Sequence, residues 1–97
     1  NKEIALYYIA QEALNNVLRH AHAHTVLVTL KQTRQNVTLE IVDDGCGFDV
    51  KNVERGGMGL QNMNVRTSQV NGKLKILSQP GSGTKVRVKV SRERLPV

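Results

Sequence analysis

The chain has 97 residues, enough for one small domain, since a core of this size buries roughly 60 to 65% of the unfolded surface. With 14 Lys and Arg against 8 Asp and Glu, its net charge of +6 suits an anionic ligand. We expect a soluble domain without an internal disulfide, because no apolar run approaches the roughly 20 residues of a membrane span, no basic-then-apolar leader opens the sequence, and one cysteine is present. Two tyrosines and one phenylalanine are too few for a base-stacking platform.

The first predicted element is a long helix from residue 1 to about residue 21, a stretch without Gly or Pro that is rich in Ala, Leu, Glu and Gln. Its apolar side chains share one arc that should face the core: Leu6, Ile9, Ala10, Ala13, Leu14 and Val17. Beside the arc runs a polar stripe: Tyr8, Glu12, Asn16, Arg19 and His20. This stripe is either a solvated helix face or one wall of a pocket.

Two strands joined as a hairpin are predicted next, over residues 25–31 and 37–42. The second strand leads into a loop in which Asp43 is followed by Gly45 and Gly47. A carboxylate there can accept a hydrogen bond from an exocyclic amine, and glycines let a flat ring approach the backbone. The same loop could equally be a plain turn.

The second half predicts a mobile flap over residues 49–55, a second helix over residues 60–70, and a closing hairpin with strands at 73–79 and 83–90. The glycine-rich start of the second helix, residues 56–59, can offer backbone N–H groups to an anion. In the last strand three cations alternate with valines, which predicts a half-buried strand with a basic solvent face: Lys85, Arg87 and Lys89.

Several common sites are disfavoured. No Walker-type phosphate loop is present, and residues 57–62 (GMGLQN) lack the last glycine of a dinucleotide fingerprint. His20 and His24 could share a helix face, but they lack nearby cysteines or acids, so zinc is disfavoured. Cys46 is interpreted as a small neutral filler of the loop rather than a reactive thiol.

Four short motifs resemble, in order and spacing, the catalytic ATP-binding domain of bacterial sensor histidine kinases, in particular the nitrate-sensor and degradation-sensor subgroup. They are residues 11–21 (QEALNNVLRHA), 43–48 (DDGCGF), 57–63 (GMGLQNM) and 81–84 (GSGT). The resemblance implies an α+β fold over residues 1–97, a two-layer α/β sandwich with helices on one face of a mixed sheet, known as the Bergerat ATP-binding fold.

The resemblance also implies residue roles. Asn16 would ligate Mg²⁺, and Glu12 would support the metal, its water or the acceptor. Asp43 would receive the adenine amino group. Nucleotide-binding positions would further include Arg19, His20, Gly45, Gly47, Gly57, Met58, Gly59, Leu60 and Thr84.

The implied activity is transfer of the γ-phosphoryl group of ATP to a histidine on a separate dimerisation domain of a homodimeric, cytoplasmic kinase that signals to a response regulator. Nucleic acid would not be a partner, and a membrane would be involved only through other parts of the parent protein. A strand before the first helix and the phosphoacceptor hairpin are missing from the pattern, which suggests truncation at the N-terminus. The alternatives are an anti-sigma-type serine kinase, a chaperone-like ATPase, and a non-catalytic nucleotide sensor or basic nucleic-acid module.

Overall fold

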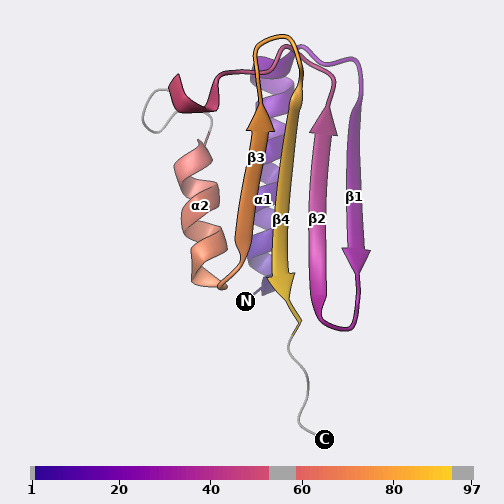
Figure 1. Cartoon of the computed structure of the whole chain (residues 1–97), viewed down its shortest axis with the longest axis vertical. Coiled ribbons are helices and arrows are strands. Elements are labelled where there is room, and N and C mark those ends of the chain that lie inside the picture. Colours follow the sequence, from indigo (N-terminus) through magenta and orange to yellow (C-terminus); the bar gives the residue numbers. More distant parts are fainter. Residues whose placement is uncertain (1, 53–58, 93–97) are drawn as a thin grey trace, which may run out of the picture.

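A computed structural model describes residues 2–52 and 59–92 of the chain, which form a layer of helices against one sheet (Figure 1). The elements in chain order are α1 (Lys2–Asn16), a π-helical turn η1 (Val17–Ala21), β1 (Val26–Gln32), β2 (Asn36–Asp43), a 3₁₀ turn η2 (Val50–Asn52), α2 (Leu60–Gln69), β3 (Lys73–Ser78) and β4 (Thr84–Ser91). The predicted helices and strands are thus confirmed to within a few residues. The predicted flap is described only as far as residue 52.

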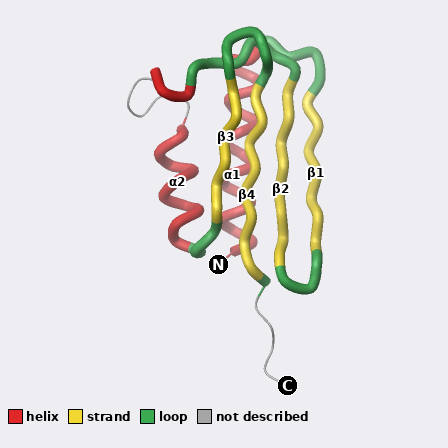
Figure 2. The backbone as a smooth tube through the Cα atoms, viewed as in Figure 1, coloured by secondary structure: helices red, strands yellow, loops and turns green. Residues whose placement is uncertain are grey.

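The sheet has the strand order β1-β2-β4-β3, and each neighbouring pair is antiparallel. The expected two-layer α+β architecture is confirmed, but the expectation of a mixed sheet is wrong for the described strands. Both hairpins, β1-β2 and β3-β4, impose antiparallel pairing. The chain crosses from β2 through α2 to β3, which runs in the same direction as β2, yet β4 lies between them (Figure 2).

The core lies between the inward face of the sheet and the two helices. It contains Ile9 and Ala13 of α1, Met63 of α2, and inward residues of β2 and β4: Leu39, Ile41, Val86 and Val88. Burying each of the larger side chains stabilises the fold by about 1.5 to 3 kcal/mol. The predicted apolar arc of the first helix is confirmed for Ile9 and Ala13, with Leu6, Ala10 and Leu14 packed at the margin of the core, whereas Val17 is half-buried at the start of η1 and is not part of the core.

The buried face of the second helix includes a polar side chain. Val65 is 49% exposed, whereas Thr67 is buried and donates its hydroxyl hydrogen to the Met63 carbonyl at 2.7 Å. This back-bond satisfies the hydroxyl inside the core. The helix ends within a residue of the predicted residue 70, where Asn71 adopts a left-handed conformation (φ 54°) and Gly72 N–H bonds to the Thr67 carbonyl.

β1 is an edge strand that the helices leave largely uncovered. Its inward residues Val26, Val28 and Leu30 are 42 to 62% exposed, although their partners on β2 are buried. Within residues 2–52 and 59–92, no helix combines the length and apolar character needed to cross a bilayer.

Candidate functional site

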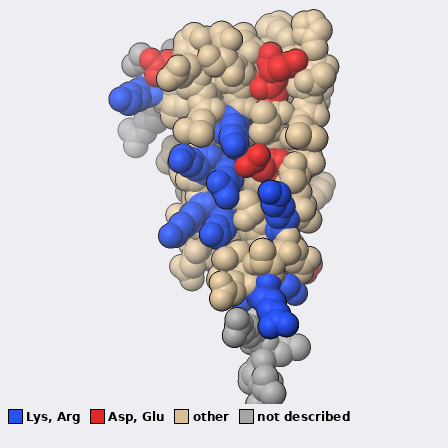
Figure 3. Space-filling model, turned by 45° about the vertical axis from the view of Figure 1, so that its right-hand side comes forward, with Lys and Arg blue, Asp and Glu red and all other residues tan. Residues whose placement is uncertain are grey.

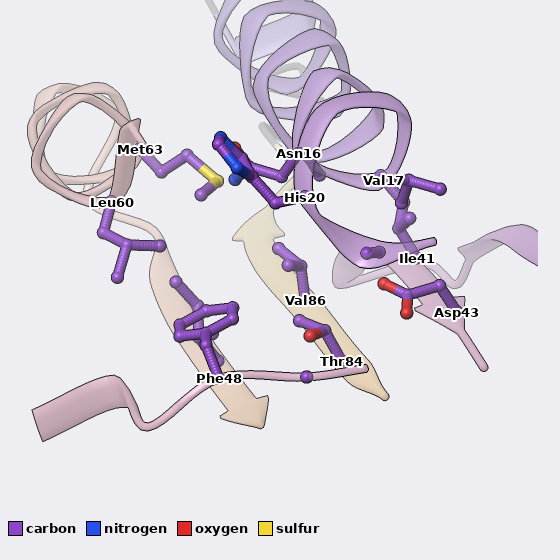
Figure 4. A pocket seen from close by; sticks show the side chains of 14 residues that line it. Asn16, Val17, His20, Ile41, Asp43, Phe48, Leu60, Met63, Thr84 and Val86 are labelled. Atoms are coloured by element: carbon purple, nitrogen blue, oxygen red, sulfur yellow. The ribbon is translucent and has the colours of Figure 1, made fainter. Parts of the chain in front are cut away.

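One pocket lies between the end of the first helix, the start of α2 and the inward face of the sheet, and encloses about 430 Å³ with the open space at its mouth (Figure 4). It is lined by Ala13, Asn16, Val17, His20, Ala21, Ile41, Asp43, Gly47, Phe48, Leu60, Met63, Ile76, Thr84 and Val86. Residues from all four sequence motifs therefore meet in one place.

Asp43 supplies the carboxylate of this pocket. It ends β2 opposite Thr84 of β4, is 8% exposed, and its carboxylate is directed into the pocket (Figure 4). Its Oδ1 accepts a hydrogen bond from Gly45 N at 2.8 Å, which orients the group. A carboxylate has acceptor sites for about four hydrogen bonds, so this one can also accept from a ligand amine.

The neighbouring acid, Asp44, has a different task. Its Oδ1 accepts hydrogen bonds from the backbone N–H groups of His24 and Thr25, both at 2.9 Å. The bond from Thr25, followed by that from His24, holds the pKa of the Asp44 carboxyl below its ordinary value of 3.8 against the opposing effect of desolvation. Asp44 thus ties the loop to the start of β1 and does not line the pocket.

A hydroxyl network fixes Thr84 at the other side of the pocket. Ser78 Oγ donates to the Gly83 carbonyl at 3.0 Å and accepts from Phe48 N at 2.9 Å, while Thr84 Oγ1 lies 2.8 Å away. Because Ser78 has one hydroxyl hydrogen, Thr84 must donate to Ser78 in this arrangement. The lone pairs of Thr84 Oγ1 are then left to accept a hydrogen bond near Asp43.

The loop glycines allow close contact between the pocket's own walls. A Cβ at Gly45 would overlap the Ala21 carbonyl, and one at Gly47 (φ 65°) would overlap the Gln79 carbonyl. Cys46 continues this contact, since its N–H bonds to the Ala21 carbonyl at 2.7 Å and its thiol donates to the His20 carbonyl at 3.1 Å. The loop is therefore fastened to η1 on one side and to the β3-β4 hairpin on the other.

The π-helical turn η1 places the polar end of the first helix at the pocket. Asn16, which precedes the turn, and His20 within it both line the pocket, and Figure 4 shows them on the side of the first helix that faces Met63. π-helical turns are rare in proteins, and those that occur are frequently found at functional sites. The predicted polar stripe thus turns partly into the pocket, and is not simply a solvated face.

The N-terminal part of the polar stripe, Tyr8 and Glu12, faces α2 instead. Glu12 lies against Gly59, the residue that precedes α2, so closely that a Cβ there would overlap the carboxylate. Gly59 also has φ 64°, a left-handed conformation that favours glycine. Tyr8 lies one turn before Glu12 on α1, and the Arg66 guanidinium of α2 lies 4.2 Å from the centre of its ring. Glu12 is therefore held at the positive end of the α2 dipole.

The structure brings together most of the predicted site residues that it describes. Those that line the pocket are Asn16, His20, Asp43, Gly47, Leu60 and Thr84. Glu12 and Gly59 meet beside it, and Gly45 supports its wall from behind. Arg19 is exposed on η1 and does not line the pocket, so its contact with phosphate stays a prediction. Gly57 and Met58 lie outside the described residues.

Sequence reasoning missed the apolar walls of the pocket. These come from Ile41, Ile76 and Val86 on the sheet, Phe48 on the loop, and Met63 on α2. The alternation of inward residues along the strands gave a signal for the first three, and Phe48, the single phenylalanine, directly follows the glycine loop. Among the described residues no group of three His, Cys, Asp or Glu side chains is placed to hold a metal ion.

Comparison with known proteins identifies the family to which this chain belongs. Residues 1–94 match the family of histidine kinase-, DNA gyrase B- and HSP90-like ATPases, and the chain belongs to this family. It is 39% identical over 85 residues to the sensor histidine kinase LiaS of Bacillus subtilis (strain 168), an alignment that covers 88% of this chain and 24% of that protein. It is 36% identical over 88 residues to the signal transduction histidine-protein kinase/phosphatase DegS of Brevibacillus brevis, covering 91% and 23%.

Solved structures agree with the fold. The histidine kinase domain of a blue-light activated histidine kinase from Erythrobacter litoralis EL346 superposes with a TM-score of 0.70 at 20% identity, over 89% of this chain and 42% of that one. The chain spans about a quarter of the length of the curated relatives. It is thus an ATP-binding domain of the histidine kinase type, and both relatives named above are histidine kinases rather than anti-sigma serine kinases.

Proposed function

We propose that this domain binds Mg-ATP and supplies the γ-phosphoryl group to a histidine on the separate dimerisation domain of its parent kinase. The observation that supports this most strongly is the meeting of four motifs around one pocket. A buried carboxylate, that of Asp43, lies at one end of that pocket, and the end of the first helix and the start of α2 line the other. The names of the relatives, both sensor or signal-transduction histidine kinases, point to the same activity.

The end of the pocket at Asp43 suits adenine. The carboxylate and Thr84 Oγ1 are acceptors on adjacent strands, and adenine presents an exocyclic amine donor. Ile41 and Val86 offer apolar surface to the faces of a flat ring, and Met63 adds a polarisable side chain. Guanine has a carbonyl at that position, and this hydrogen-bond acceptor could not bond to the acceptor oxygens of Asp43 and Thr84.

The end near α2 suits the phosphates and a magnesium ion. The N-terminus of a helix favours anions, and α2 begins directly beside Glu12 and close to the pocket. The side-chain carbonyl of Asn16 is a hard oxygen ligand of the type Mg²⁺ prefers. We assign Asn16 to the metal, Arg19, Gly57 and Gly59 to the phosphates, and His20 to a place beside the nucleotide. The ion would neutralise phosphate charge when bound.

The residues of this chain act by positioning. Asp43 and Thr84 orient the base, the apolar walls exclude water, and Asn16 and the start of α2 hold the triphosphate with its γ-phosphorus open to solvent. Glu12, one turn from Asn16 on the same helix, is placed to accept the proton of an incoming imidazole or to orient it. The phosphoryl group then leaves ADP for that imidazole nitrogen, in line with the breaking bond.

The partners follow from this proposal. The acceptor histidine would belong to dimerisation helices of a homodimeric parent, which would pass the phosphoryl group to a response regulator. The domain would work in the cytoplasm, where ATP and the regulator are found.

Isothermal titration calorimetry of this chain with ATP, with and without Mg²⁺, tests the binding part of the proposal. We expect saturable ATP binding that magnesium strengthens and that GTP does not match. Failure to bind ATP in the presence of Mg²⁺ would overturn the proposed function.

A further inference from the structure

The outward face of the sheet, on the side away from the helices and the pocket, has an ordered pattern of side chains. The antiparallel register aligns its outward residues in rows across the strands β1, β2, β4 and β3. These rows are Lys31, Thr38, Lys89 and Lys73; then Thr29, Glu40, Arg87 and Lys75; then Leu27, Val42, Lys85 and Leu77. We call them the first, second and third rows of the outward face.

The first two rows place like charges directly opposite one another. Lys73 pairs with Lys89, and Lys75 pairs with Arg87, across the β3-β4 ladder. Such pairs destabilise a sheet. Glu40 is the single acid among these rows and lies 3.6 Å from Lys85, both side chains being partly exposed, so it offsets little of the charge. The face therefore carries an excess of positive charge, and Figure 3 shows Lys and Arg gathered on it.

The third row adds apolar side chains to this field. Leu27 is 65% exposed and Leu77 is 50% exposed, and Val42 lies between their strands on the same face. Leu27 and Leu77 end this row on the two edge strands, with Val42 and Lys85 between them, so the apolar and basic side chains project from the same face. Basic and apolar side chains are also combined in the amphipathic helices that lie on membrane surfaces.

We propose that the outward face of the sheet binds the surface of an anionic lipid bilayer. Its cations would meet acidic headgroups, a cluster of about four to eight Lys or Arg being typical of such recognition, and Leu27 and Leu77 would enter the headgroup boundary. Nucleic acid fits less well, because none of the side chains in the rows is aromatic and leucines gain nothing from a phosphate backbone.

This surface and the nucleotide pocket lie on opposite faces of the same sheet. The pocket uses the inward residues Ile41, Ile76 and Val86, whereas the bilayer would contact the outward residues between them. Both partners can therefore bind at once, and a bilayer would orient the helices and the pocket away from itself. The proposal does not depend on phosphoryl transfer.

Co-sedimentation with lipid vesicles tests it. The vesicles are phosphatidylcholine alone, or phosphatidylcholine with about 30% phosphatidylglycerol, at low and high salt. The test variant is Lys75→Gln/Lys89→Gln on the outward face. The matched control, Lys51→Gln/Arg66→Gln, removes the same charge from exposed residues of η2 and α2. Leu27→Ser/Leu77→Ser tests the apolar row.

We expect binding to the anionic vesicles alone, weakened by salt. Lys75→Gln/Lys89→Gln should reduce affinity about 10- to 30-fold, with the control pair unchanged. The leucine variant should also bind more weakly, and all variants should keep the circular dichroism spectrum and ATP affinity of the parent. Equal loss in both charge variants, equal binding to neutral vesicles, or tighter binding to duplex DNA with the same variant dependence would each overturn the proposal.

Discussion

Asp43 Oδ1 accepts a hydrogen bond from Gly45 N at 2.8 Å, so the carboxylate that faces the pocket is oriented by the loop that follows it. Asp43→Asn would keep this bond by turning its amide oxygen to Gly45, which leaves the NH₂ group facing the pocket. A donor would then meet the adenine amine. We expect ATP affinity to fall by about one to two decades, since losing a bond to a charged acceptor costs about 1.5 to 3 kcal/mol.

GTP should be affected less by Asp43→Asn, because guanine presents a carbonyl that the new NH₂ group can bind. Calorimetric titration of both nucleotides measures the difference. Equal losses for ATP and GTP would mean that Asp43 serves the fold and not base recognition.

Asn16→Ala should remove the magnesium dependence of ATP binding and leave stability nearly unchanged. Asn16 lines the pocket and lies outside the apolar core, so the substitution creates no large core cavity. Asn15→Ala is the matched control, since Asn15 is exposed on the same helix one residue earlier. If ATP binds with the same dependence on Mg²⁺ in both variants, Asn16 is not a metal ligand.

Gly59→Ala should weaken ATP binding more than adenosine binding. Its Cβ would overlap the Glu12 carboxylate at the start of α2, where we place the phosphates. Gly81→Ala separates this effect from backbone strain, because Gly81 also has positive φ (85°) but its Cβ would meet nothing within 4 Å. Both variants pay a conformational cost of about 1 kcal/mol. A Gly81→Ala variant that loses as much ATP affinity as Gly59→Ala would contradict this assignment.

Asp44 makes stability depend on acid pH. Its pKa is lower in the folded chain than the ordinary value of 3.8, so its bonds to the His24 and Thr25 N–H groups stabilise the fold above about pH 4. That contribution is lost as pH falls through the folded-state pKa. Urea unfolding of Asp44→Asn should therefore show a loss of stability at neutral pH that shrinks near pH 3. A deficit that grows on acidification would contradict this sign.

Sequence patterns predicted the elements because their signals are local. The alternation of apolar and polar residues predicted β2 and β4, and a long stretch without Gly or Pro predicted α1. The π-helical turn at Val17–Ala21 was not predictable in this way, since it accommodates the loop that bonds to the carbonyls of His20 and Ala21. The burial of Thr67 with Val65 left exposed likewise depends on how α2 packs in the folded chain, which no local pattern encodes.

The sequence predicted the polar residues of the candidate site but not the backbone contacts that hold its loop in place. Asp43, Asn16 and Thr84 belong to motifs with recognisable spacing, and the structure gathers them. For Gly45 and Gly47 the sequence suggested room for a ligand ring, whereas the structure shows that a side chain would strike the chain's own backbone at Ala21 and Gln79. Such contacts join residues distant in sequence, so no local pattern reveals them.

The central claim is a division of labour between this domain and an acceptor on another part of the kinase. His20 follows Asn16 by one turn at the same helix end, and both line the pocket. If Asn16 holds the magnesium ion as we propose, the γ-phosphate would meet His20 from the side and not in line with the breaking bond. His22 and His24 lie beyond η1.

Incubation with γ-labelled ATP and Mg²⁺, with and without a helical hairpin that carries an acceptor histidine, tests this claim most directly. We predict that the chain alone remains unlabelled and that the added hairpin acquires a label stable to alkali and lost in acid, as phosphohistidine is. Acid-labile label on His20, His22 or His24 of the chain alone would contradict the account.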